Sequence, residues 1–191
     1  MATMCLLNIC LVLLFSTEIY SLDCKMLHLQ QNKVNMKSLE LLSKMGGQFP
    51  LQCLNENRNV GFLQKVLRPT ESQKENAKLI ILEIFQQIFN IFSKNLTQAA
   101  WDRSFIQSFQ NGLYQQIEQL EKCLHSEREN EIPYLGNEKI LFPLLKLKKY
   151  FERIGDFLKE KQYSLCAWET IRWEMERCLL FVDQLTERLQ N

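Results

Sequence analysis

Apolar residues recur every three or four positions over most of the chain, which is the spacing of one face of an α-helix. We predict five helices from this pattern, over residues 26–45, 71–93, 101–124, 137–160 and 164–189. The second helix is apolar around most of its circumference, as in a helix buried on more than one side. The fifth repeats its apolar positions near every 3.5 residues, which is typical of helices that pack along one another at shallow angles.

The longest connection runs from Gln48 to Thr70, has no clear period and contains Cys53. A loop of this length in a compact domain is usually functional or tied down, and Cys53 is the candidate tie. Gly46-Gly47 marks the end of the helix before it, and Thr70 suits the N-cap of the helix after it. Five helices with one long early crossover predict an all-α bundle with overhand connections, the layout of helical cytokines.

Two further boundaries depend on polar residues and on a proline. The stretch 125–137 is rich in charged residues, and we predict a solvated loop there. Pro143 lies early in the fourth helix, so this helix either begins near Phe142 or kinks there. A short loop over residues 161–163 then leads to the fifth helix.

The first residues differ from the rest of the chain. Met4 to Phe15 is an apolar run interrupted only by Asn8, and small Ser21 follows a few polar residues later. A membrane span needs about twenty apolar residues, so an anchor fits this run poorly, and the first residues carry no Lys or Arg. We predict a signal peptide over residues 1–21, cleaved after Ser21, and a secreted helical domain over residues 22–191.

The composition excludes several classes of protein. Hydrophobic residues make up 46% of the 191 residues and charged residues 24%, as in ordinary globular domains. Only 6 Gly and 4 Pro are present, too few for the many turns of a β-sandwich. Cleavage removes Glu18 and no basic residue, which leaves 23 basic and 22 − 1 = 21 acidic side chains, a net charge of +2. This balance argues against a nucleic-acid or membrane-surface binder.

The cysteine count suits an oxidising compartment. Cys5 and Cys10 leave with the signal peptide, and five cysteines remain. These are Cys24, Cys53, Cys123, Cys166 and Cys178. We expect two disulfides and one free thiol, although the spacing alone leaves the pairing open. Cys178 lies on the apolar stripe of the fifth helix and is the candidate free thiol.

No arrangement of residues typical of an enzyme or a metal site is evident. The sequence has no Gly-rich phosphate loop, no H-E-x-x-H and no G-x-S-x-G. Only two histidines are present, and the closest of the five mature cysteines, Cys166 and Cys178, are too far apart for a zinc pair. We therefore expect no catalysis, no cofactor and no metal. Asn95-Leu96-Thr97 is an N-glycosylation sequon, which suits an exported protein.

Five segments resemble the type I interferons. Residues 88–93 (IFNIFS), 99–102 (AAWD) and 113–116 (LYQQ) resemble the second and third helices of that family. Residues 149–154 (KYFERI) and 163–169 (YSLCAWE) resemble its fourth and fifth helices, and the likeness extends over essentially the whole mature chain. Residues 21–24 (SLDC) and 177–179 (RCL) look similar to the kappa and epsilon branches.

The resemblance implies a pairing of the cysteines and a mechanism. It implies the disulfides Cys24–Cys123 and Cys53–Cys166, with Cys178 free. It also implies a cytokine, expected to be a monomer, that engages the two chains of the type I interferon receptor on opposite faces. The kinases on the receptor tails would then meet and induce antiviral genes.

The resemblance further implies one contact surface for each receptor chain. For the high-affinity chain it implies residues of the long loop and the fifth helix, namely Leu54, Asn57, Arg58, Arg172, Trp173, Glu176 and Arg177. For the second chain it implies Gln110, Tyr114 and Lys148. Asn57 stands where the family has an important arginine, and Trp173 and Glu176 replace small and apolar residues of the alpha branch. These departures predict weaker binding of the high-affinity chain, for which Trp173 could compensate as an aromatic anchor.

Two other functions fit parts of the pattern. Another helical cytokine would use a different receptor, but the C-A-W-E and Y-F-x-R-I stretches argue against it. A helical lipid carrier would enclose a ligand between its apolar stripes. Its one support is the very apolar second helix, which an ordinary core explains as well.

Overall fold

The computed structural model describes residues 24, 27–54, 76–94, 96–130 and 138–188. Within these ranges the chain forms helices and no strand. The helices are α2 (Leu27–Gly46), the 3-10 turn η1 (Leu51–Cys53), α5 (Ala77–Phe92), α6 (Arg103–Asn130), α7 (Glu138–Glu160) and α8 (Leu165–Arg188). The prediction of an all-α chain with five α-helices is confirmed.

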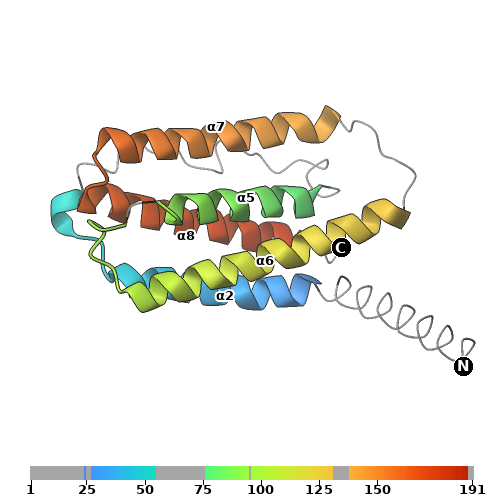
Figure 1. Cartoon of the computed structure of the whole chain (residues 1–191), viewed down its shortest axis with the longest axis horizontal. Helices are drawn as coiled ribbons and strands as arrows, with labels where there is room; N and C mark the ends of the chain where they lie inside the picture. Colours follow the sequence, from blue (N-terminus) through green and yellow to red (C-terminus); the bar gives the residue numbers. More distant parts are fainter. Residues whose placement is uncertain (1–23, 25–26, 55–75, 95, 131–137, 189–191) are drawn as a thin grey trace, which may run out of the picture.

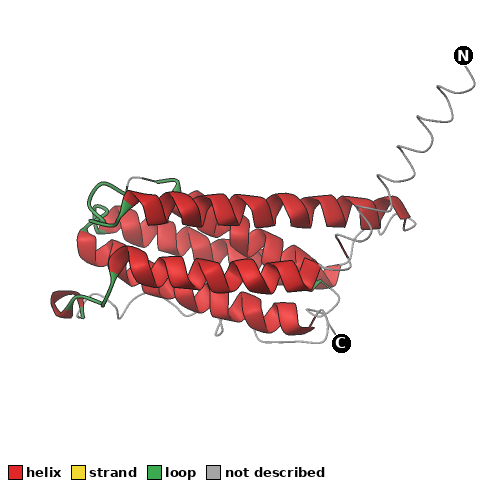
Figure 2. Cartoon of the chain, turned by 90° about the horizontal axis from the view of Figure 1, so that it is seen from below, coloured by secondary structure: helices red, strands yellow, loops and turns green. Residues whose placement is uncertain are grey.

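The five helices pack as an elongated bundle (Figures 1 and 2). α2, α5 and α7 run in one direction, and α6 and α8 run in the other (Figure 1). α2 contacts α6 and α8, while α5 contacts α6, α7 and α8. Because α2 and α5 are consecutive but parallel, a crossover connection joins them, as predicted.

The core forms where the apolar stripes of the five helices meet. Ile80, Ile84 and Ile88 of α5 are fully buried, as expected for a helix surrounded by three others. At one end of the bundle the Phe92 ring contacts the rings of Trp101, Phe109 and Trp168, with centroid separations of 4.8–6.3 Å. Aromatic contacts of this kind contribute stability beyond the area that they bury.

Local polar contacts set several helix ends. Gly47 has a φ of 65°, a backbone conformation that glycine adopts without strain, and it ends α2. At the start of α6 the Asp102 carboxylate accepts hydrogen bonds from the Ser104 hydroxyl at 2.6 Å and from the Ser104 N–H at 2.7 Å, and both lower the pKa of Asp102. The Ser164 hydroxyl oxygen accepts one from the Ala167 N–H at 3.3 Å, so Ser164 caps α8.

One predicted boundary is wrong. We expected the third helix to end at Leu124, but α6 continues to Asn130. The polar residues 125–130 include no Gly or Pro to stop a helix, and Glu and Arg are good helix formers. An ion pair between Glu127 and Lys78 of α5 also attaches this extension to the bundle.

The other two boundaries differ in how far the structure describes them. Pro143 lies inside α7, which begins at Glu138, so the helix does not start at Phe142. The expected start of the second helix, including the Thr70 cap, lies outside the described residues; the described α5 begins at Ala77.

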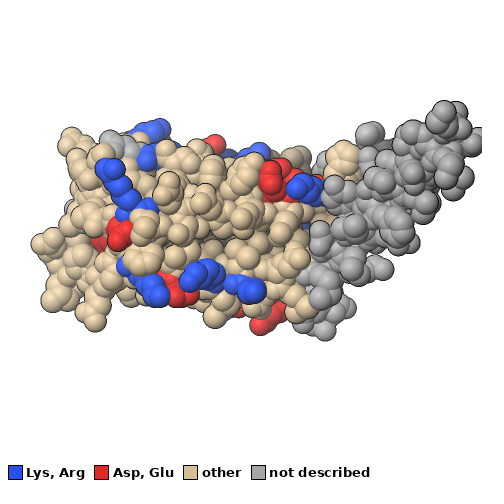
Figure 3. Space-filling model, turned by 60° about the horizontal axis from the view of Figure 1, so that its bottom comes forward, with Lys and Arg blue, Asp and Glu red and all other residues tan. Residues whose placement is uncertain are grey.

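Charged side chains of both signs are mixed on the surface. On the face shown in Figure 3, Lys and Arg lie beside Asp and Glu in small groups separated by neutral areas. On α2, Glu40 lies 2.5 Å from Lys44 and 2.9 Å from Lys37, and these hydrogen bonds lower the pKa of Glu40 to about 2. None of the helices in the described ranges combines the length and hydrophobicity of a membrane span.

Candidate functional site

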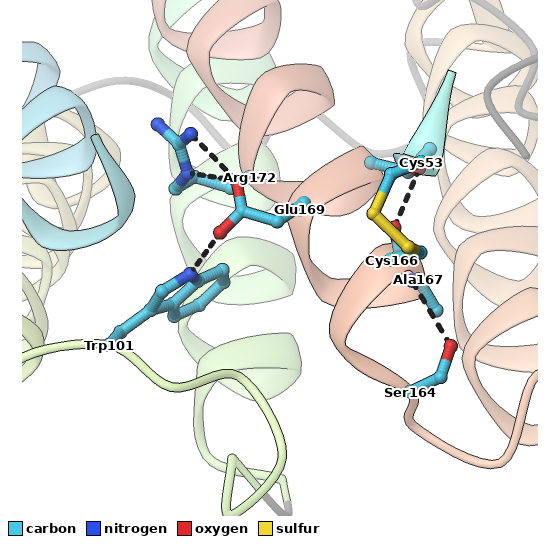
Figure 4. Close-up of a disulfide and its surroundings, with 8 residues drawn as sticks. Cys53, Trp101, Ser164, Cys166, Ala167, Glu169 and Arg172 are labelled. Carbon is cyan, nitrogen blue, oxygen red and sulfur yellow. Dashed lines mark hydrogen bonds and ion pairs between the residues drawn. A yellow bond between two sulfur atoms is a disulfide. The ribbon is translucent and has the colours of Figure 1, made fainter. Parts of the chain in front are cut away.

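Two disulfides hold the bundle at separate places. Cys24 pairs with Cys123, which joins the start of α2 to α6 with a Cα–Cα distance of 5.5 Å. Cys53 of η1 pairs with Cys166 in the first turn of α8, with a Cα–Cα distance of 5.0 Å (Figure 4). This is the pairing that the resemblance implies. The second disulfide fixes η1 against α8 and therefore holds Leu54, the next residue, near that helix.

Arg172 lies inside the protein, which corrects the expectation that it contacts a receptor. Its side chain is only 2% exposed, and its Nη2 lies 2.7 Å from the Glu169 carboxylate (Figure 4). The guanidinium also donates to the carbonyl oxygens of Leu42 and Gly47 at 3.0 and 2.8 Å. Glu169 in turn accepts a hydrogen bond from the Trp101 indole N–H at 2.5 Å. Arg172 is therefore committed to internal partners.

A second group of predicted residues is exposed along η1 and α8. Leu54 is 56% exposed and Trp173 is 40% exposed, although the Trp173 ring also meets Phe49 edge-on at 5.6 Å. Arg177 lies one turn after Trp173 and is half-exposed, and Glu176 is half-buried. Residues four apart on a helix are neighbours, so Trp173 and Arg177 share one face.

Two exposed apolar residues extend this group and were missed in the sequence. Leu51 is 83% exposed on η1, and Leu180 is 47% exposed on α8. Leu180 follows Trp173 by seven residues, which places it on the same face of α8, and this spacing could have identified it. We call the group Leu51, Leu54, Trp173, Glu176, Arg177 and Leu180 the α8 surface.

Tyr114 and Lys148 lie on different helices, but both contact α5. The Tyr114 ring, 52% exposed, packs on Phe89 with centroids 6.4 Å apart. The Lys148 ammonium lies 4.0 Å from the Glu83 carboxylate. The Tyr114 hydroxyl donates to Glu118 at 2.8 Å, and this bond to a carboxylate raises the pKa of Tyr114.

Gln110 is less free than the sequence predicted. We expected it to point outward one turn before Tyr114, but it is half-buried. Its amide nitrogen donates to the carbonyl oxygen of Phe92, the last residue of α5, at 2.9 Å. This hydrogen bond satisfies a carbonyl that has no partner within its own helix. We call the group Glu83, Phe89, Gln110, Tyr114, Glu118 and Lys148 the α5 surface.

Cys178 is buried and unpaired in the part of the chain that the structure describes. Its sulfur lies 3.6 Å from the Tyr150 hydroxyl, which also bonds to Glu174. Burial raises the pKa of the Cys178 thiol, so the reactive thiolate is disfavoured. Glu174 is itself buried, and Arg177 lies 3.5 Å from its carboxylate. Arg177 therefore faces solvent and also compensates a buried charge.

Three predicted site residues lie outside the described residues. They are Asn57 and Arg58 of the long loop and Asn95 of the sequon. The predicted signal peptide, residues 1–21, lies outside them as well.

Comparison with known proteins decides the family. A model of the interferon alpha/beta domain matches residues 27–189, which is most of the chain and includes both surfaces. The chain belongs to the type I interferon family. Proteins of this family are cytokines and not enzymes.

The relatives of this interferon include the branches predicted from the sequence. Human interferon epsilon is 41% identical over 95% of this chain and 86% of its own length. Human interferon kappa is 37% identical over 91% of this chain and 88% of its own length. Interferon beta of the echidna Tachyglossus aculeatus aculeatus is 41% identical over 82% of both chains. The prediction of an interferon similar to the epsilon and kappa branches is confirmed.

The fold of this interferon also occurs among solved structures. Zebrafish interferon 2 superposes with a TM-score of 0.68 at 26% identity, covering 80% of this chain and 97% of the zebrafish chain. The helical-cytokine bundle predicted from the sequence is thus confirmed by a second route.

Proposed function

We propose that this interferon is a secreted cytokine that bridges the two chains of the type I interferon receptor. Bridging would bring together the kinases attached to the receptor tails and induce antiviral and immune genes. The observation that carries the proposal is that the α8 surface lies on η1 and α8, whereas the α5 surface is formed by α5 together with α6 and α7.

The relative position of the two surfaces follows from the packing of the helices. α5 and α8 contact each other inside the bundle. Trp173 is exposed on α8 and Tyr114 on α6, and α2 and α5 each contact both of these helices. A molecule bound at Trp173 and one bound at Tyr114 would lie on different sides of the bundle and would not compete for space. This arrangement suits a template that holds two membrane receptors at once.

The α8 surface has the composition of a protein-binding surface. Trp173 offers an aromatic side chain, flanked by the apolar Leu54 and Leu180 and by the basic Arg177. Tryptophan and arginine are enriched among the residues that dominate binding energy. We assign this surface to the high-affinity receptor chain, with Asn57 and Arg58 of the following loop and with Glu176 as further contacts.

The α5 surface is more polar and suits the second receptor chain. The exposed Tyr114 ring packs on Phe89. Charged residues of the same surface include Glu118, Glu83 and Lys148. Charged groups at an interface rim set the association rate and the specificity more than the affinity. We assign Gln110, Tyr114 and Lys148 to this contact.

Secretion and glycosylation complete the proposal. The apolar segment before residue 22 would direct export, and Asn95, three residues after the end of α5, would carry a glycan. A monomer suffices, because one chain carries both surfaces.

The test is binding of purified residues 22–191 to the ectodomain of each receptor chain. Trp173→Ala should weaken binding of the high-affinity chain by about 2 kcal/mol or more, roughly thirtyfold, and leave the second chain unaffected. Tyr114→Ala should do the reverse. Met36→Ala, which removes an exposed apolar side chain from α2 outside both surfaces, is the matched control. If the wild type and the three variants bound both receptor chains equally well, the assignment of one surface to each chain would be wrong.

A further inference from the structure

The segment from Gly47 to Leu54 follows α2 and contributes Leu51 and Leu54 to the α8 surface. It is held at both of its ends. At the far end the Cys53–Cys166 disulfide joins it to α8. At the near end the Arg172 guanidinium donates to the Gly47 carbonyl oxygen at 2.8 Å. Both attachments, Cys166 and Arg172, lie in the first two turns of α8. This helix therefore holds the segment at two points.

Arg172 reaches the near end because α2 leaves room for it. Its Nη1 donates to the carbonyl oxygen of Leu42, in the last turns of α2, at 3.0 Å. Gly46 lies beside it, and a Cβ atom at this position would be 2.4 Å from the Arg172 Nε. Any other residue at position 46 would therefore force the guanidinium to move.

The Glu169 carboxylate compensates the buried charge of Arg172. One carboxylate oxygen accepts hydrogen bonds from the Arg172 Nε and Nη2 at 3.1 and 2.7 Å, and the other accepts the Trp101 N–H at 2.5 Å. Both charges are thus compensated and hydrogen-bonded, which a buried ion pair requires. The pair fixes the direction of the guanidinium and hence the two carbonyl oxygens to which it donates.

Trp173, the next residue along α8, contacts the same segment on the protein surface. Trp173 is exposed, and its ring meets Phe49 edge-on at 5.6 Å. Arg172 and Trp173 therefore contact positions 47 and 49 of the segment from the interior and from the surface.

We propose that Arg172 is a positioning residue for receptor binding: it holds residues 47–54 in the conformation that presents Leu51 and Leu54 beside Trp173. Arg172 contacts no receptor and acts through the segment. This inference rests on the proposed function, because it assumes that the α8 surface binds the high-affinity chain. Preorganisation lowers the entropy that binding must otherwise overcome.

The first part of the test needs no receptor. Hydrogen exchange is measured on purified residues 22–191 and on the variants Gly46→Ala and Arg172→Lys. Lysine carries its donors on one nitrogen and cannot span Glu169, Leu42 and Gly47 together. Both variants should raise the exchange of amides 47–54 by about tenfold or more, with core amides of α6 unchanged.

Gly112→Ala is the matched control for the glycine substitution. Its Cβ would meet Val34 and Ser38 at 3.7 and 3.9 Å, which are ordinary contacts, so segment 47–54 should stay protected. Should Gly46→Ala not fold, Arg172→Lys decides the test. Unchanged exchange of amides 47–54 in the folded variants would overturn the proposal.

The second part measures receptor affinity. Each variant should bind the high-affinity chain about tenfold more weakly, because ordering even one residue on binding costs about this factor. Binding of the second chain should not change. Leu120→Ala, a core substitution on α6, provides a comparable loss of stability without touching the segment and should bind like the wild type.

The outcomes separate the two proposals. A loosened segment with unchanged affinity for the high-affinity chain would overturn the positioning role alone. Wild-type protein that binds neither receptor chain would overturn the proposed function, and the positioning role with it.

Discussion

Two arginines of α8 show how much the helical position of a residue decides. Arg172 is in phase with the buried Trp168, Met175 and Leu179, whereas Arg177 is in phase with the exposed Trp173. The first arginine closes an internal network and the second reaches solvent. The resemblance to the family implied that both arginines contact the receptor. Their positions on the helix show that one is buried and the other is exposed.

The free thiol gives a residue-scale prediction. Cys178 is buried, and burial raises its pKa, so the native thiol should be unreactive. In residues 22–191 we expect iodoacetamide at pH 8 to label Cys178 about a thousandfold or more slowly than in denaturant, because labelling must wait for opening of the fold. Mass spectrometry after timed quenching measures this rate.

Cys178→Ala is the control for that experiment, since it should show no labelling even in denaturant. Native labelling of the wild type at the denatured rate would contradict the buried position of Cys178.

At the scale of elements, the disulfide between η1 and α8 has a role distinct from that of the other disulfide. Cys53 and Cys166 are separated by 113 residues, so the bridge constrains a long stretch of the unfolded chain. In the loop-entropy model such a bridge contributes about 4–5 kcal/mol. In the folded protein it also anchors the segment 47–54 to α8.

We therefore predict two effects of Cys53→Ser or Cys166→Ser. Thermal unfolding should occur at a lower temperature, and amides 47–54 should exchange faster. Cys24→Ser, which breaks the bridge between α2 and α6, is the matched control: it should lower the unfolding temperature and leave amides 47–54 protected. Variants at Cys53 and Cys166 with wild-type stability and exchange would contradict this role of the bridge.

The helices could be predicted from the sequence because each depends on a local pattern. Gly46-Gly47 marked the end of α2, and the stripe on α8 marked its buried side. The end of α6 was placed too early because a run of polar residues was interpreted as a loop, although nothing in it stops a helix. Polarity alone does not end a helix when Glu and Arg supply good propensity.

The internal network around Arg172 could not be predicted in the same way. Its partners Leu42 and Gly47 lie 130 and 125 residues away in sequence, and they contribute backbone carbonyls, which no residue type reveals. The hydrogen bond of Gln110 to the Phe92 carbonyl was missed for the same reason. Leu180, in contrast, was within reach of the sequence, since it repeats the phase of Trp173.

At the scale of the whole molecule, the bundle separates two surfaces and keeps them in a fixed relation. Trp173 lies on α8 and Tyr114 on α6, and α2 and α5 each contact both of these helices. The Cys24–Cys123 disulfide attaches the start of α2 to α6, and the Cys53–Cys166 disulfide attaches η1 to α8. Arg172 of α8 also donates to the Leu42 carbonyl oxygen near the end of α2. A rigid body of this kind needs no change of shape to bind two partners, and the surfaces need not touch. Signalling would then depend on both surfaces being occupied in one complex.

The central claim is that this interferon signals by bridging the two chains of the type I interferon receptor. The most direct measurement applies purified residues 22–191 to interferon-responsive reporter cells of a matched species, intact or lacking one receptor chain. We predict induction in intact cells and none when either chain is deleted. Induction that survives both deletions, or folded and disulfide-bonded protein that induces nothing in intact cells, would contradict the account.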